Sequence, residues 1–195
     1  KDKVAEAVYK CIKDFFEEKI LSNENLSDKE VKNIFLNKRF TATKDQKFLK
    51  SILWEIEFQQ KSLMKLPDTT NEDLKQWDSY HIEHIYPQAD KDSWKEYYDI
   101  DSSDQKSEDA HAQLFDSRYN AGNATLWHKN PNTSFSDSPF SKKLKEYKKE
   151  DKYIHKFIVE EKESDNDSGW TKKCISQMSE RYGNMVVDIL KKLSQ

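Results

Sequence analysis

A chain of 195 residues with 35% hydrophobic and 35% charged side chains is long enough for one or two modest domains, and its clustered apolar residues exclude wholesale disorder. Its net charge of -3, from 33 basic and 36 acidic side chains, neither requires nor excludes nucleic acid, because a local basic patch can coexist with an acidic remainder. A run of about 18 apolar residues is absent, as is a signal-peptide core, so no membrane association is predicted.

The two cysteines indicate a reducing compartment. Cys11 and Cys174 lie far apart, and no CxxC or CxxH spacing occurs. This pattern predicts buried thiols in the cytoplasm and leaves too few ligands for a zinc knuckle. The chain begins at Lys1 rather than at methionine, so we expect it to be a piece of a longer protein.

Three helices are predicted in the first third of the chain. Apolar residues at helical spacing predict a helix over about residues 2–21. Ser27 and Glu30 form a capping-box pattern that opens a short second helix. A third helix, over about residues 44–63, carries an aromatic stripe that is typical of a hydrophobic core. Together they predict an N-terminal helical segment over residues 1–66, which ends at a polar break.

The next segment is centred on an acid directly beside a histidine, Glu83 and His84. Adjacent side chains on a strand point to opposite faces, so these two can act on one reactant only where the strand bends or ends. Pro87 supplies such an end, because it donates no ladder hydrogen bond and favours an extended residue before it. We predict a strand end that presents a metal-binding carboxylate and an imidazole base.

A second strand and a helix complete this segment. The charged region 89–120 is predicted to be an insertion, after which Gly122 and Asn123 predict a tight turn into the second strand. A lysine-rich helix follows. The order of strand, insertion, strand and helix predicts a core over residues 71–150, on which the amphipathic helices of residues 151–195 are expected to pack.

Residues of this core suit phosphodiester hydrolysis, which needs a deprotonated water and a cation to neutralise charge on the phosphate. An imidazole with an ordinary pKa of about 6.5 is a suitable base. A hard divalent ion prefers oxygen ligands, and Glu83 with an asparagine of the turn before the helix would supply them beside His84. Lys142, Lys143 and Lys145 would face the DNA backbone, unless they form only a solvated helix face.

Three ordered motifs occur in the chain: Glu83-His84-Ile85-Tyr86-Pro87-Gln88, Gly122-Asn123-Ala124-Thr125-Leu126 and Asn132-Thr133-Ser134-Phe135-Ser136-Asp137-Ser138-Pro139-Phe140-Ser141-Lys142-Lys143. Together they resemble the C-terminal HNH (His-Me finger) nuclease domain of GmrSD-type modification-dependent, type IV restriction enzymes. The resemblance covers nearly the whole chain. It implies a mostly helical α+β fold, in which a ββα-metal core is flanked by helical bundle segments.

The resemblance also implies a role for each motif residue. His84 would be the general base, and Glu83 and Asn132 would bind the catalytic Mg²⁺, for which Mn²⁺ could substitute. Asn123 would hydrogen-bond the backbone of the His84 loop rather than contact the ion. The proline turn before Asn132 leaves Asn130 as an alternative ligand.

Four further side chains are candidate contacts to DNA phosphates. His81 lies two residues before Glu83 and so shares its face of the strand, as an outer-shell residue, a phosphate contact or simply a surface histidine. His128 is near enough to the predicted site to contact phosphate. Lys142 and Lys143 complete the set.

We therefore predict a metal-dependent DNA endonuclease, the nuclease part of an anti-phage restriction enzyme that acts on modified double-stranded DNA in the bacterial or archaeal cytoplasm. By the resemblance, the parent enzyme carries an N-terminal NTPase domain of ParB/sulfiredoxin-like type, which senses modification and is absent from this chain. Two alternatives stay open. One is a catalytically silent nucleic-acid-binding module that guides a partner nuclease, and the other is an RNA-directed nuclease.

Overall fold

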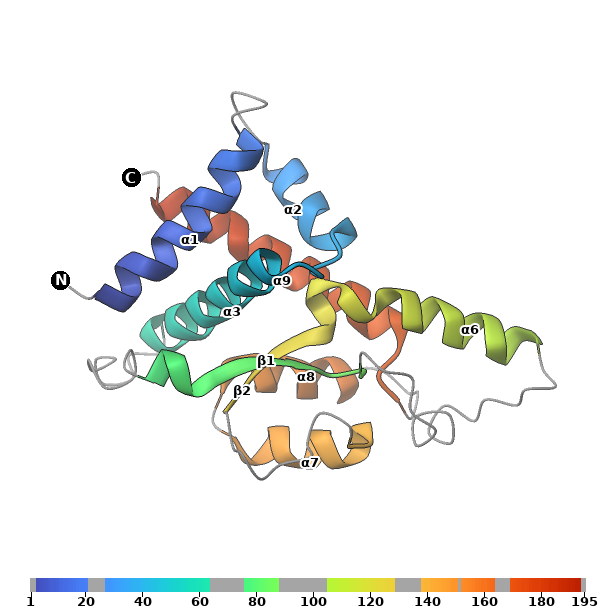
Figure 1. The fold of residues 1–195 in the computed structure, drawn as a ribbon. Coiled ribbons are helices and arrows are strands. Elements are labelled where there is room, and N and C mark those ends of the chain that lie inside the picture. The colour runs from blue at the N-terminus through green and yellow to red at the C-terminus, as the bar shows by residue number, and fades with distance from the viewer. Residues whose placement is uncertain are drawn as a thin grey trace.

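A computed structural model of the chain describes residues 3–20, 27–63, 76–87, 105–128, 138–150, 152–163 and 169–193. In it, helices surround one small antiparallel sheet, which confirms the predicted mostly helical α+β fold (Figure 1). The α-helices are α1 (Lys3–Ile20), α2 (Asp28–Asn37), α3 (Thr43–Leu63), α6 (Gln105–Asp116), α7 (Phe140–Lys149), α8 (Tyr153–Glu163) and α9 (Lys172–Leu193). None of the helices in these ranges combines the length and apolar character that crossing a membrane requires.

Local sequence signals account for the first helices. Ser27 caps α2 as predicted, because its hydroxyl accepts the Glu30 backbone N–H at 3.4 Å and its own N–H donates to the Glu30 carboxylate at 2.7 Å. The aromatic stripe of α3 is buried against α1, where the rings of Phe15 and Phe48 stack with centroids 3.6 Å apart. Helix α9 packs on α2 and closes this side of the molecule.

The sheet consists of β1 (Tyr80–His84) and β2 (Ala124–His128), which pair antiparallel with Glu83 opposite Thr125 and His84 opposite Ala124. A short 3-10 helix, η1 (Gln76–Ser79), leads into β1. Directly opposed residues of such a pair share a face, so His81, Glu83 and Trp127 lie on one face of the sheet.

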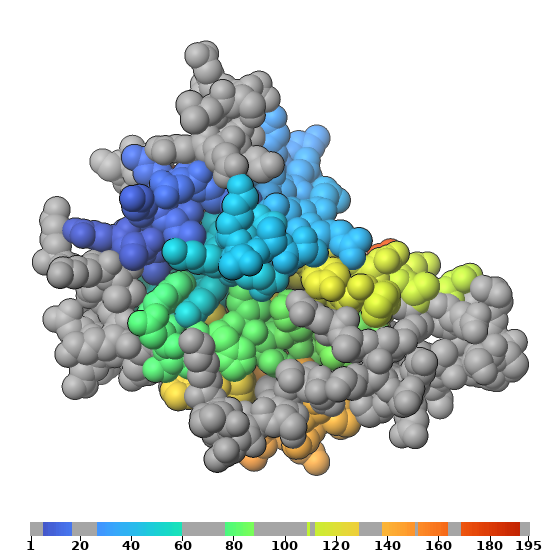
Figure 2. Space-filling model, in the orientation of Figure 1, coloured from blue at the N-terminus to red at the C-terminus, as the bar shows by residue number. Residues whose placement is uncertain are grey.

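Helices cover both faces of this sheet (Figure 1). On the face of Glu83, the Trp127 ring packs against Tyr147 of α7 and His155 of α8, with centroids 5.8 and 5.5 Å away. On the other face, Tyr80 lies against Trp54 of α3 at 5.5 Å. The sheet is thus enclosed between α3 with α9 and α7 with α8. Part of the green segment of residues 76–87 still reaches the surface in the space-filling view, between the blue-to-teal N-terminal residues and the orange residues (Figure 2).

The turn before β2 lies directly on α9. Two 3-10 helices, η2 (Ser117–Tyr119) and η3 (Ala121–Asn123), form this turn. The Gly122 N–H donates to the Ser179 hydroxyl at 2.9 Å, and a Cβ on Gly122 would lie 2.0 Å from the Ile175 carbonyl oxygen. Only glycine allows this approach, and the approach holds the following residue, Asn123, in place.

The three segments predicted from the sequence share one hydrophobic core. It includes Phe16 and Ile52 from the first segment, Leu126 from the second, and Ile158 and Tyr182 from the third. The polar break after residue 66 and half of the predicted insertion, residues 89–104, lie outside the described residues. The segment boundaries therefore stay predictions.

Candidate active site

The predicted strand end is present after His84. β1 stops at this residue, the Ile85 N–H still donates to the Asn123 carbonyl at 2.9 Å, and the chain bends at the buried Ile85 and Tyr86, directly before Pro87. Proline donates no further ladder hydrogen bond, so the pairing with β2 cannot continue. The backbone around His84 is therefore a strand end held at a defined point of the sheet.

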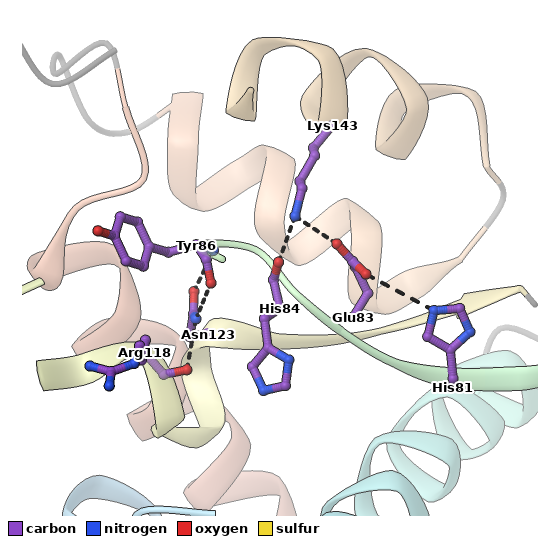
Figure 3. A network of polar contacts seen from close by, with 7 residues as sticks. All are labelled: His81, Glu83, His84, Tyr86, Arg118, Asn123 and Lys143. Carbon is purple, nitrogen blue, oxygen red and sulfur yellow. Dashed lines mark hydrogen bonds and ion pairs between the residues drawn. The ribbon is translucent and has the colours of Figure 1, made fainter. Parts of the chain in front are cut away.

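Asn123 clamps this strand end through its side chain (Figure 3). Its Oδ1 accepts the Tyr86 N–H at 2.7 Å, and its Nδ2 donates to the carbonyl oxygens of Tyr86 at 2.8 Å and Arg118 at 2.9 Å. Asn123 has no exposed surface, so water does not compete for these hydrogen bonds. These are the backbone contacts that the resemblance implies for Asn123, while its part in catalysis stays a prediction.

Glu83 is held from the opposite side by a lysine of α7. Its carboxylate, only 3% exposed, accepts a hydrogen bond from Lys143 Nζ at Oε1, over 2.6 Å. The same ammonium donates to the His84 carbonyl oxygen at 2.6 Å. One buried cation therefore joins α7 to both residues of the acid-histidine pair.

The structure corrects the expected role of Lys143 as a phosphate contact. The Lys143 side chain has no exposed surface, so in this conformation it cannot face a DNA backbone. Its burial follows from helical spacing, because Phe140, Lys143 and Tyr147 lie on one face of α7 and all three are buried. This i, i+3, i+7 spacing could have predicted the burial of Lys143 from the sequence, but the neighbouring exposed lysines favoured the interpretation of a solvated or DNA-facing run.

The other candidate DNA contacts lie at the surface. Lys142 and Lys145 are on α7, where Lys142 is exposed, and His128 is exposed at the end of β2 with its ring 5.3 Å from that of Tyr80. His81, 40% exposed, places its Nε2 4.0 Å from Glu83 Oε2, so the two share a face as predicted. Contact of these residues with DNA stays a prediction.

The His84 ring lies on the opposite side of β1 from the Glu83 carboxylate (Figure 3). The strand ends after His84, yet the two side chains keep the alternation of a strand and do not converge. Burial lowers the pKa of His84 from 6.5 to about 4, and the nearby charge of Lys143 acts in the same direction. The imidazole is therefore neutral near pH 7, with a lone pair on one ring nitrogen, and the lowered pKa makes it a weaker base than an ordinary histidine.

Of the predicted metal ligands, the described residues include Glu83 alone. Among the described residues no group of three or more His, Cys, Asp or Glu could hold a metal, and the predicted ligand Asn132 and its alternative Asn130 lie outside them. The Glu83 carboxylate, however, already accommodates a cation, the ammonium of Lys143. A carboxylate and an amide oxygen are the hard donors that Mg²⁺ and Mn²⁺ prefer.

The chain was compared with known protein families and with curated proteins. The family model described as GmrSD restriction endonucleases, C-terminal domain, matches residues 26–185, a range that includes both strands, the Asn123 clamp and α7. No curated protein matches the chain.

Proposed function

Because this chain belongs to the family of GmrSD restriction endonuclease C-terminal domains, we propose that it cleaves DNA by metal-dependent hydrolysis in an HNH-type site. Membership makes the chain a nuclease module of a restriction endonuclease, which is a hydrolase, and implies DNA as its substrate. The proposal adds that the reaction requires a divalent metal ion, that the motif residues carry it out, and that the substrate is the modified phage DNA that the resemblance suggests.

In the proposed mechanism, His84 is the general base, and for it to act on the same phosphate as an ion at Glu83, one of the two side chains must turn from the side of β1 that it occupies in this structure. A ring nitrogen of its neutral imidazole takes a proton from the attacking water, and the oxygen of that water bonds to phosphorus as the bond to the leaving oxygen breaks. Glu83 and Asn132 would hold the divalent ion, which when bound supplies positive charge to the phosphate oxygens. The exposed Lys142 and His128 would contact neighbouring phosphates.

The observation that carries this proposal is the Asn123 clamp. A general base contributes only if its ring is held at a defined position, and Asn123 holds the backbone directly after His84, at Ile85 and Tyr86. The Ile85 N–H donates to the Asn123 carbonyl, and the Asn123 side chain binds both polar backbone atoms of Tyr86. The order of β1, β2 and α7 supports the ββα arrangement of an HNH site.

Removal of the metal is expected to abolish cleavage. Purified protein should nick and linearise plasmid DNA with Mg²⁺ or Mn²⁺, and excess EDTA should reduce the rate to background, because the phosphate charge is then not neutralised. Gel electrophoresis of the plasmid measures both states. Cleavage that persists in EDTA would refute the metal requirement.

DNA binding without any cleavage would instead favour the silent binding module, and faster digestion of RNA of matched sequence would favour the RNA-directed nuclease.

The cleavage rate is expected to stay nearly constant down to a pH well below the one at which an ordinary histidine becomes protonated. Because burial lowers the pKa of His84 to about 4, its base form is present above that pH and is lost only as the pH falls through it. Single-turnover rates with saturating Mn²⁺ should therefore change little between about pH 8 and about pH 5. A decline centred near pH 6.5 would show that an imidazole with an ordinary pKa, and not the desolvated His84, controls the reaction.

A further inference from the structure

Lys143 is the one charged side chain of α7 that lies on the helix's buried face among the described residues. The face is otherwise aromatic, with Phe140 and Tyr147 one turn to either side. A buried carboxylate without a cation is costly, and so is a buried ammonium without an anion. The 2.6 Å pair of Lys143 with Glu83 satisfies both groups in the metal-free protein.

We propose that Lys143 is a built-in cation of the metal-free site, which occupies the Glu83 carboxylate and competes with the divalent ion for it. This inference rests on the proposed function in one respect, the assignment of Glu83 as a metal ligand. Lys143 is here a positioning residue, because it acts through Glu83 and the His84 carbonyl rather than on the substrate.

Charge is the first reason for this competition. A divalent ion bound to Glu83 would lie within a few ångströms of the ammonium that donates to Oε1. In a site with little water, like charges at that distance repel strongly, so the ion and Lys143 cannot both occupy the carboxylate at full affinity.

The side chain of Lys143 is the second reason. A lysine ammonium is compact and sits on a flexible four-carbon stem, so it can leave Glu83 without any movement of α7. Its departure would also release the His84 carbonyl, to which it donates at 2.6 Å. Binding of the ion would then also change the hydrogen bonding of the His84 backbone.

The decisive experiment is Mn²⁺ titration of the whole chain by calorimetry, without DNA. Lys143→Met removes the charge and keeps most of the stem, so Mn²⁺ should bind with a Kd on the order of tenfold lower or more than in the wild type. Lys149→Met is the matched control, because Lys149 of α7 also pairs with a carboxylate at 2.6 Å, that of Glu146, but is 68% exposed. Screening by water should leave its Kd within about twofold of the wild type.

The melting temperature gives a second measure in the same variants. Without metal, Lys143→Met should unfold at a lower temperature than the wild type, because Glu83 has lost its cation. Saturating Mn²⁺ should raise its melting temperature by more than it raises that of the wild type, since tighter binding to the native state stabilises it more. Equal affinities and equal Mn²⁺ effects in the two proteins would overturn the proposal.

A measurement on the wild type covers the case in which Lys143→Met fails to fold. Acylation of lysines, read by mass spectrometry, should label the buried Lys143 far more slowly than Lys149 in the metal-free protein. Saturating Mn²⁺ should raise the labelling of Lys143 severalfold and leave that of Lys149 unchanged. If the labelling of Lys143 does not respond to Mn²⁺, the ion does not displace the lysine and the proposal is wrong.

Glu83→Gln separates this proposal from the proposed function. Loss of Mn²⁺ binding in Glu83→Gln, together with equal affinity in Lys143→Met and the wild type, would overturn the competition and leave the metal site intact. Mn²⁺ binding that is unaffected by Glu83→Gln would refute the assignment of Glu83 as a ligand, and with it both proposals.

Discussion

Replacing His84 with alanine is expected to lower the single-turnover rate of DNA cleavage by about 10²- to 10⁴-fold, the range that a general base contributes. The substitution removes the only proton acceptor proposed for the attacking water. It keeps the His84 carbonyl that Lys143 binds and the Tyr86 N–H that Asn123 binds, so Glu83, Lys143 and the Asn123 clamp are expected to stay in place. Quenched-flow or manual time courses with excess protein measure the effect.

DNA-binding controls show whether such a loss lies in the chemical step. His84→Ala should bind plasmid with nearly wild-type affinity, since the imidazole is neutral near pH 7 and adds no charge toward phosphate. His128→Ala, at the exposed end of β2, should weaken DNA binding and spare the rate at saturating protein. Cleavage by His84→Ala at the wild-type rate would remove His84 from the mechanism.

Replacing Asn123 with alanine is expected to cost several kcal/mol of the free energy of unfolding. The substitution removes the hydrogen bonds that the Asn123 side chain makes to the Tyr86 N–H and to the carbonyl oxygens of Tyr86 and Arg118. A buried polar group left without a partner costs about 1–3 kcal/mol. The cleavage rate should also fall, because the loop that follows His84 is no longer held. Urea unfolding followed by circular dichroism measures the first effect, and plasmid cleavage the second.

The matched control for this change is Asn184→Ala on α9. Asn184 is exposed, so its replacement should alter the free energy of unfolding by less than about 0.5 kcal/mol. Asn123→Asp tests the donor function, since a carboxylate can accept the Tyr86 N–H but cannot donate to the two carbonyl oxygens. Wild-type stability in Asn123→Ala and Asn123→Asp would mean that the hydrogen bonds of the clamp contribute nothing to the strand end.

Features that depend on neighbours in the sequence were predictable. The Ser27 capping box of α2 depends on residues three apart, and the end of β1 depends on a proline that cannot donate a hydrogen bond. The mostly helical fold followed from periodic apolar residues. The backbone contact of Asn123 came from the motif resemblance rather than from any local pattern, because Asn123 and Tyr86 are 37 residues apart.

Features that depend on packing were predicted less well. The lysine-rich run predicts a Lys143 that faces DNA like its neighbours, although its spacing from Phe140 and Tyr147 places it on the inner face of α7. A pKa of about 4 for His84 could not be read from its neighbours in the chain, since burial is its main cause. The need for glycine at position 122 also arises from a distant element, the backbone of α9.

By itself, the sequence determined the elements, the strand end at Glu83 and His84, and the family to which the chain belongs, because each depends on short motifs and their order. Only the tertiary structure decided which residues share the site. The packing of α7 against β1 buries Lys143 beside Glu83, and the alternation of the strand turns the His84 ring to the other side. Burial then sets the charge states of the site, since desolvation disfavours a lone charge and so favours a paired carboxylate and a neutral imidazole.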